Sequence, residues 1–211
     1  MKTALLLGAS GLTGNLLLEQ LLDSNYYEKI IVYVRKPLSI NHPKLQQQTV
    51  DFENLTTAVD ADDIFCCLGT TIKKAGSKEA FEKVDFEYPL QIAQLQKQAG
   101  TKNCFVITAM GSKKTSAIFY NRVKGKLEEA LQNLGFSSLY IFRPSLIVGN
   151  RTEKRLGEKL GIAIFNIANF ILPKNYQSVK AKAIAESMLH FAKNAVDGNH
   201  VILSGRIKEF E

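Results

Sequence analysis

Tyr120 and Lys124 stand four residues apart at the start of a stretch with helical spacing, so a helix would place the phenol and the ammonium on one face. A tyrosine with an ordinary pKa of about 10 is a poor proton donor or acceptor at pH 7, but a cation held beside it lowers that pKa. The pair could therefore protonate a carbonyl that is being reduced, or accept a proton from an alcohol that is being oxidised. Taken alone, the same spacing is also typical of a solvated helix face.

A glycine-rich turn near the N-terminus is the second candidate for chemistry, because Gly8, Gly11 and Gly14 recur at a spacing of three between an apolar run at residues 4–7 and a leucine-rich helical pattern. In such a turn Gly8 allows a sharp bend, Gly11 lets a pyrophosphate approach the backbone, and Gly14 lets the helix pack closely on the sheet. The N-terminus of the helix would face the phosphates, because its unpaired N–H groups and its dipole favour an anion. An ordinary strand-to-helix turn is the alternative interpretation.

The second predicted strand, residues 29–35, ends in Arg35 and Lys36. In dinucleotide-binding folds an acidic residue near this point binds the ribose 2′-hydroxyl of NAD. A guanidinium can instead grip a phosphate with two hydrogen bonds, so this basic end suits the 2′-phosphate of NADP. Solvated charge at a strand end is the alternative. Asp51, which follows a third predicted strand at residues 46–50, would lie beside the adenine.

The elements that must position these groups alternate along the chain. Further strands are expected at residues 64–68, 104–108, 139–142 and 200–203, and helices at 13–22, 54–59, 81–98, 119–134 and 181–193. This alternation predicts an α/β fold with a doubly wound parallel sheet and right-handed crossovers. At 211 residues the chain suits one domain, with residues 1–148 as a core and 149–211 as a small, largely helical extension on the substrate side.

Composition bounds the setting of the protein. Three cysteines make neither a disulfide framework nor a metal-binding spacing, so we predict no metal site and a reducing compartment. The N-terminus shows no secretory pattern, and a cytoplasmic protein is expected. Residues 160–172 are nearly all apolar but too few to span a bilayer. They favour a buried helix over the site or a dimer face, with membrane-surface attachment as the weaker alternative.

The net charge of +7 arises from 27 basic against 20 acidic residues. Charge of this sign makes nucleic acid a candidate partner. The basic residues are spread along the whole length, however, and no nucleic-acid motif accompanies them. We therefore predict a solvated basic surface that attracts a polyanionic cofactor or substrate, and no nucleic-acid partner.

Together these motifs resemble the short-chain dehydrogenase/reductase superfamily in its atypical branch, and more closely the Tat-interacting-protein-like oxidoreductases. The resemblance covers nearly the whole chain in the same order, and the run Cys-Cys-Leu-Gly-Thr-Thr is far more specific than the glycines. It rests on residues 8–14, 50–53, 66–71, 74–76, 84–85, 120, 123–125 and 142–144.

The resemblance implies a Rossmann fold that binds NADPH. The implied or predicted cofactor contacts are Gly8, Ser10, Gly11, Leu12, Thr13 and Gly14 around the pyrophosphate, Arg35 and Lys36 at the 2′-phosphate, Asp51 beside the adenine, Leu68, Gly69 and Thr70 on the ribose and nicotinamide side, Tyr120 and Lys124 at the reactive end, Ile147 near the carboxamide, and Arg155. Thr108 would orient the substrate carbonyl, with Ser112 as the fallback. Two positions depart from the family pattern: Ala109, where relatives carry a second serine, and Asp85, where many have Asn.

The expected function is NADPH-dependent reduction of a small carbonyl substrate, with Tyr120 as the acid/base. A cofactor-binding regulator with little turnover, acting through a protein partner, is the alternative, because some relatives are described as regulators. A homodimer is compatible with either interpretation.

Overall fold

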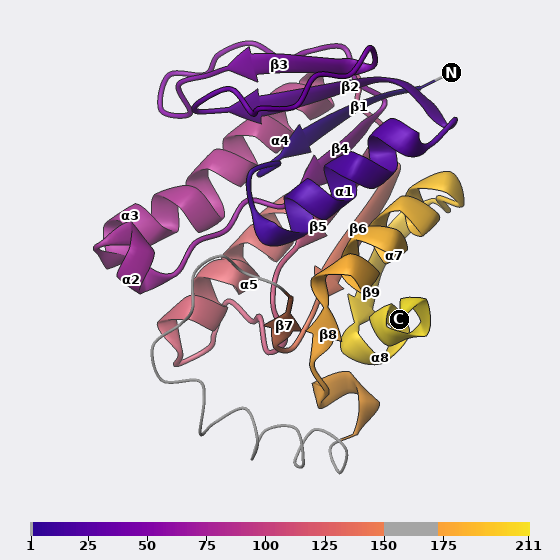
Figure 1. Cartoon of the computed structure of the whole chain (residues 1–211). Helices are drawn as coiled ribbons and strands as arrows, with labels where there is room; N and C mark the ends of the chain where they lie inside the picture. The colour runs from indigo at the N-terminus through magenta and orange to yellow at the C-terminus, as the bar shows by residue number, and fades with distance from the viewer. Residues whose placement is uncertain (1, 150–172) are drawn as a thin grey trace.

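The computed structural model describes residues 2–149 and 173–211. A seven-stranded sheet with the order β3-β2-β1-β4-β5-β6-β9 is its central element, and every neighbouring pair is parallel (Figure 1). The strands are β1 (Lys2–Leu7), β2 (Tyr27–Val34), β3 (Leu45–Thr49), β4 (Asp63–Cys66), β5 (Asn103–Ile107), β6 (Ser138–Arg143) and β9 (Gly198–Leu203). A separate parallel pair is formed by β7 (Ile147–Val148) and β8 (Val179–Lys180).

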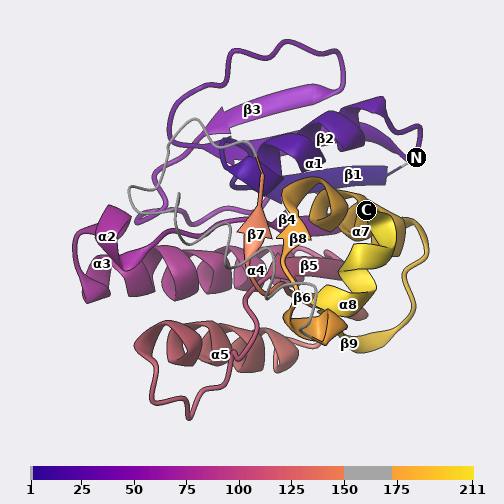
Figure 2. The same cartoon turned by 60° about the horizontal axis from the view of Figure 1, so that its bottom comes forward.

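Helices cover both faces of the sheet. On one face α1 (Leu12–Asp23) lies beside α7 (Ala181–Lys193), and on the other α4 (Tyr88–Gln98) lies beside α5 (Phe119–Gln132) (Figures 1 and 2). The shorter helices are α2 (Ile72–Ala75), α3 (Lys78–Glu82), the π-helical turn η1 (Lys83–Glu87), η2 (Lys174–Tyr176), α8 (Ser204–Ile207) and η3 (Lys208–Phe210). The predicted doubly wound parallel sheet of the Rossmann type is confirmed.

Burial on both faces explains the apolar run that opens the chain. Ala4 and Leu6 join the hydrophobic cluster under α1 and α7, whereas Leu5 and Leu7 join the cluster under α4 and α5. All four side chains have no exposed surface. A strand in the middle of a parallel sheet needs apolar residues at consecutive positions, and that requirement makes β1 easy to predict.

The expected helix at residues 54–59 is wrong, because the structure has a turn and irregular backbone there. The carboxylate of Asp51 accepts hydrogen bonds from the Glu53 N–H (3.0 Å) and the Asn54 side-chain amide (2.6 Å). Such a local side-chain turn competes with helix formation, and β-branched Thr56 and Thr57 favour helix weakly.

The single helix expected at residues 81–98 is divided. A π-helical turn, in which the Tyr88 N–H donates to the Lys83 carbonyl, separates α3 from α4. In a regular α-helix the ring of Pro89 would clash with the carbonyl of Asp85, four residues earlier, and the wider turn relieves that clash.

The C-terminal stretch that was expected to form an extension contributes to the sheet and its cover. In the structure α7 packs beside α1, and β9 pairs with β6. The predicted apolar helix at residues 160–172 lies outside the described residues.

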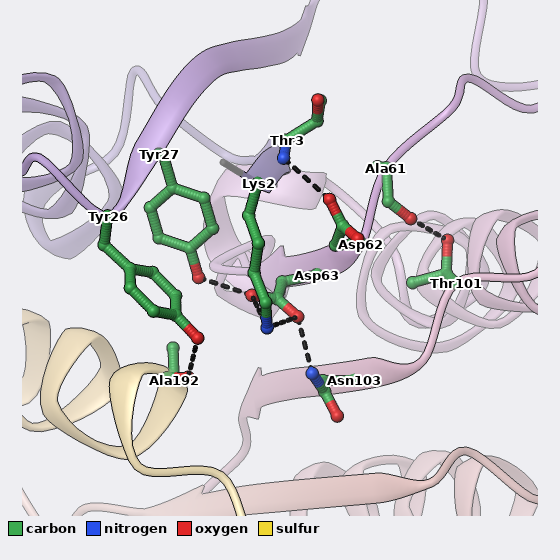
Figure 3. Close-up of polar contacts among 10 residues, drawn as sticks. All are labelled: Lys2, Thr3, Tyr26, Tyr27, Ala61, Asp62, Asp63, Thr101, Asn103 and Ala192. Atoms are coloured by element: carbon green, nitrogen blue, oxygen red, sulfur yellow. Dashed lines mark hydrogen bonds and ion pairs between the residues drawn. The ribbon is translucent and has the colours of Figure 1, made fainter.

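A buried carboxylate joins four strands at the amino edge of the sheet (Figure 3). Asp63 of β4 accepts hydrogen bonds from the Tyr27 hydroxyl (2.6 Å) and the Asn103 amide (2.6 Å), and it forms an ion pair with Lys2 (3.4 Å). Burial, and then the Asp63 charge, raise the pKa of Tyr27 far above its ordinary value, so the phenol stays a neutral donor.

Replacing Asp63 by alanine would leave the Tyr27 hydroxyl, the Asn103 amide and the Lys2 ammonium without their common acceptor. We expect the Asp63→Ala variant to lose about 3–5 kcal/mol of unfolding free energy in urea titrations. The exposed neighbour Asp60 supplies the control, since Asp60→Ala should stay within about 0.5 kcal/mol of the parent. Equal losses in both variants would contradict this role for Asp63.

Candidate functional site

The glycine turn is close-packed at the carboxyl end of β1. Gly8 has a φ of 82°, and a Cβ there would lie 2.5 Å from the Cys67 carbonyl oxygen. A Cβ on Gly14 would lie 2.1 Å from the Gly8 carbonyl oxygen, and one on Gly11 would lie 3.2 Å from the same atom. The turn therefore requires glycine at residues 8 and 14, where the first turn of α1 crosses the bend and the end of β4.

The N-terminus of α1 is uncapped. Gly11 is the N-cap residue, and within residues 2–149 and 173–211 no side chain caps the N–H groups of the first turn. Ser10 and Gly11 are exposed, Leu12 is half-buried, and Thr13 is buried. An exposed, uncapped N-terminus backed by a glycine bend is a suitable cradle for a pyrophosphate, so these residues fit the phosphate part of a dinucleotide.

Basic residues follow the neighbouring strand at the same edge. Leu7 pairs with Tyr33 in the sheet, so the glycine turn and Arg35 leave adjacent strands at the same level. Arg35 and Lys36 are both exposed. Asp51 follows β3 and is also exposed, and its hydrogen bonds to the Asn54 amide and the Glu53 N–H lower its pKa.

The predicted reactive pair lies in the first turns of α5. Lys124 is only 3% exposed, and its Nζ lies 2.8 Å from Oδ1 of Asp85, which is 1% exposed. Burial lowers the pKa of Lys124, but the charges of Asp85 and Tyr120 outweigh it, and the pKa is raised. The ring of Tyr120 packs on Phe81 with centroids 5.5 Å apart. Lys124 is therefore a charged ammonium beside the phenol.

The loop after β4 closes on the same ion pair. Oδ2 of Asp85 accepts a hydrogen bond from the Thr70 N–H at 2.9 Å. A Cβ on Gly69 would lie 3.5 Å from Asp85 Oδ1 and 3.8 Å from Lys124 Nζ. Burial raises the pKa of the nearby Cys66 thiol to about 11, so this cysteine stays uncharged. The structure thus brings Gly69 and Thr70 together with the reactive pair.

The two hydroxyls considered for the substrate carbonyl both bond to protein acceptors. Thr108 donates to Oε1 of Glu128 at 2.5 Å, and Ser112 donates to the carbonyl oxygen of Ala109 at 2.7 Å. Glu128 is buried and also receives Nε (3.0 Å) and Nη2 (2.5 Å) of Arg143. The role of either hydroxyl stays a prediction.

Two features near Thr108 and Ser112 were not predicted from the sequence. Glu128 lies four residues after Lys124 on the buried side of α5, and that position was the available signal. A Cβ on Gly125 would lie 2.2 Å from the backbone of Lys113, so this glycine lets the loop after β5 cross the helix. Gly125 and Glu128 both line a cavity of about 220 Å³, and among the predicted site residues that the structure describes Ser112 alone lines it.

Three predicted residues remain, and two of them lie within the described part of the chain. Ile147 is half-buried in β7, and a Cβ on Gly149 would lie 3.1 Å from Cδ2 of Leu12, so this segment borders the N-terminus of α1. Leu68 is half-buried directly after the end of β4. Arg155 lies outside the described residues.

An added methyl group at residue 14 would collide with the Gly8 carbonyl, whatever the helix propensity of alanine. We expect Gly14→Ala to lower the unfolding free energy by about 1–3 kcal/mol, as overpacking does. Asn15→Ala, on the next and half-buried position of α1, should change it by no more than about 0.5 kcal/mol. A stabilised Gly14→Ala protein in chemical denaturation would refute the close packing.

Solved structures with the same fold include two proteins in complex with NAD. MoeE5 in complex with UDP-glucuronic acid and NAD has a TM-score of 0.71 at 12% identity and covers 94% of this chain and 75% of that chain. The Bordetella bronchiseptica enzyme WbmH in complex with NAD+ has a TM-score of 0.71 at 15% identity and covers 99% and 79%. At such identities the likeness shows the fold alone.

The curated relatives correct the expected location. Protein fmp52, mitochondrial, of Aspergillus clavatus is 30% identical over 94% of this chain and 90% of that protein. Protein FMP52, mitochondrial, of Candida albicans is 27% identical over 92% and 89%. The prediction of a cytoplasmic protein is therefore wrong, since these names point to the mitochondrion. No helix among residues 2–149 and 173–211 is long and apolar enough to cross a membrane.

Family membership follows from two further matches. Protein HTATIP2 of Rattus norvegicus is 34% identical over 97% of this chain and 87% of that protein. The sequence model of the HIM1 family matches residues 21–176. These matches confirm the resemblance to the Tat-interacting-protein type of atypical short-chain dehydrogenase, and the chain belongs to the HIM1 family of HTATIP2-like proteins.

Proposed function

We propose that the protein binds NADPH at the carboxyl edge of its sheet and reduces a small carbonyl substrate, with Tyr120 as the proton donor. The observation that carries this proposal is the buried Lys124 ammonium, held beside Tyr120 by Asp85 and bordered by Gly69. A charged lysine in this position stabilises the negative charge that forms on the tyrosine oxygen when its proton is transferred.

The chain's own groups suit each part of the cofactor. The uncapped N-terminus of α1 would bind the pyrophosphate, with the exposed backbone of Gly11 approaching it closely. Asp51 would lie beside the adenine, and Gly69 on the side of the nicotinamide ribose, where Lys124 would donate to a ribose hydroxyl. The exposed pair of Arg35 and Lys36 supports NADP over NAD.

The proton and the hydride come from different places. A reduced nicotinamide supplies, when bound, a hydride for the carbonyl carbon. Tyr120 donates its phenolic proton to the carbonyl oxygen, and the neighbouring Lys124 stabilises the phenolate that remains. The hydroxyl of Thr108 or Ser112 orients the carbonyl, and for this it must turn from Glu128 or from Ala109.

The bond between Thr108 and Glu128 favours a second candidate function. A hydroxyl that donates its proton in a hydrogen bond to a buried carboxylate does not donate it to a substrate. With neither hydroxyl turned toward a carbonyl, the protein would hold NADPH with little turnover and act through a protein partner. The two candidates differ in turnover and agree in cofactor binding.

Replacing Tyr120 by phenylalanine removes the proton donor and keeps the ring that packs on Phe81. We expect Tyr120→Phe to reduce NADPH oxidation with an aldehyde and ketone panel by about 10²–10⁴-fold while the Kd for NADPH changes little. Tyr88→Phe, which removes only an exposed hydrogen bond to Glu53, is the matched control and should keep full activity.

Retained turnover in Tyr120→Phe would refute the role of Tyr120. NADPH binding by the parent protein without turnover across the panel would favour the regulator. Absence of NADPH binding by folded protein would contradict both candidates.

The choice of NADP over NAD is testable at Arg35. We expect Arg35→Ser to weaken NADPH binding by roughly 10-fold or more, the value of a lost charge-assisted hydrogen bond, and to leave NADH binding nearly unchanged. Lys29→Ser removes one exposed charge from the same strand far from its carboxyl end, so it should affect neither affinity. Equal weakening of NADPH and NADH in titrations of Arg35→Ser would contradict the assignment.

A further inference from the structure

Asp85 contacts two parts of the site at once, and it takes no part in the proton or hydride transfer described above. We propose that Asp85 is a positioning residue whose carboxylate holds the Lys124 ammonium and the loop after β4 as one unit. The inference rests on the proposed function, because it deepens the account of how that site binds its cofactor.

The two carboxylate oxygens point to two different elements. Oδ1 lies 2.8 Å from Nζ of Lys124 on α5, and Oδ2 accepts the Thr70 N–H of the loop after β4 at 2.9 Å. Asp85 is 1% exposed and Lys124 3%, so both charges are almost fully removed from water. A buried charge pair with this geometry resists displacement of either partner, because separating them leaves an uncompensated charge.

An asparagine at the same place would not reproduce these contacts. Its amide has one acceptor oxygen, and its NH₂ group is a donor that would face either the Lys124 ammonium or the Thr70 N–H. One of the two contacts of Asp85 would therefore become repulsive. A carboxylate is the side chain of this size that can form an ion pair with Lys124 and accept the Thr70 N–H at the same time.

The backbone around Asp85 is built to aim it inward. The π-helical turn Lys83–Glu87 carries Asp85 at its centre, and Pro89 prevents a regular α-helical turn there. Phe81, just before this turn, packs on the ring of Tyr120. One short segment thus supports the phenol by ring packing and the ammonium by charge.

The arrangement also sets where Lys124 loses its proton. The groups that face this ammonium are Asp85 from η1, Tyr120 from α5 and Cys66 from β4. Burial lowers the pKa of Lys124, and Asp85 is the largest influence that raises it. Without the carboxylate, the effect of burial would dominate and the pKa would fall. Cofactor binding that depends on the ammonium would then fail at a lower pH.

The test is Asp85→Asn, measured by NADPH titration from neutral to alkaline pH. We expect roughly 10-fold weaker binding at neutral pH, and an alkaline loss of binding that begins at a lower pH than in the parent. Glu82→Gln is the matched control, because it removes a charge pair between α3 and α5, Lys126–Glu82 at 2.8 Å, that is partly exposed. This control should leave both the affinity and the pH profile unchanged.

A double variant separates positioning from general damage. If Asp85 acts through Lys124, adding Asp85→Asn to Lys124→Met should weaken NADPH binding by much less than adding it to the parent. The double variant also removes both buried charges together, so it should fold even where Asp85→Asn alone does not. Unchanged affinity and pH profile in a folded Asp85→Asn protein, or an equal loss in both backgrounds, would overturn the proposal.

The failure of the proposed function looks different. In that case the parent protein binds neither NADPH nor NADH. The parent, Asp85→Asn, Lys124→Met and the double variant are then compared by chemical denaturation without cofactor. Strong coupling between residues 85 and 124 in unfolding free energy supports the positioning role, whereas additive effects overturn it.

Discussion

The buried ion pair between Lys124 and Asp85 is the interaction on which the rest of the site depends. Two charges removed from water are tolerated only when they are paired and hydrogen-bonded, so every element that carries one of them is constrained by the other. The constraint reaches α5 through Lys124, the π-helical turn through Asp85, and the loop after β4 through the Thr70 N–H. Tyr120 lies on the same face of α5 as Lys124, so its phenol is next to an ammonium whose position is fixed by Asp85. A side chain on a loop without such a shared contact would be positioned less precisely.

The sheet supplies the second half of the arrangement. In a parallel sheet all carboxyl ends share one edge, so the glycine turn after β1, the basic residues after β2 and the loop after β4 meet there without any long connection. Close packing fixes the turn, because Gly14 lies against the carbonyl of Gly8. Polar contacts of Asp63 fix the opposite edge, where Tyr27 and Asn103 hold the strands in register. The site therefore lies at the carboxyl edge of a sheet whose amino edge is tied together by Asp63.

The predictions that succeeded rest on local patterns. Apolar runs located the strands, and the glycine spacing located the first turn, because burial and backbone clash act on neighbouring residues. The predictions that failed involve competing local structures or contacts between residues that are far apart in the sequence. The helix expected at residues 54–59 does not form, because the side chain of Asp51 makes a local turn instead. The long helix expected at 81–98 is divided by a π-helical turn before Pro89. The partner of Thr108 could not be predicted, since Glu128 is twenty residues away and only the packing of α5 on the sheet brings them together. The predicted cellular location was wrong, and the names of the relatives correct it.

The measurement that tests the central claim most directly is a crystal structure of the protein grown with NADP+. The account predicts the pyrophosphate at the backbone of Gly11 and the first turn of α1, and the nicotinamide ribose within about 2.7–3.2 Å of Lys124 Nζ, with Asp85 still paired to that lysine. A cofactor bound away from the carboxyl edge of the sheet, or one bound there with Tyr120 and Lys124 out of its reach, would contradict it.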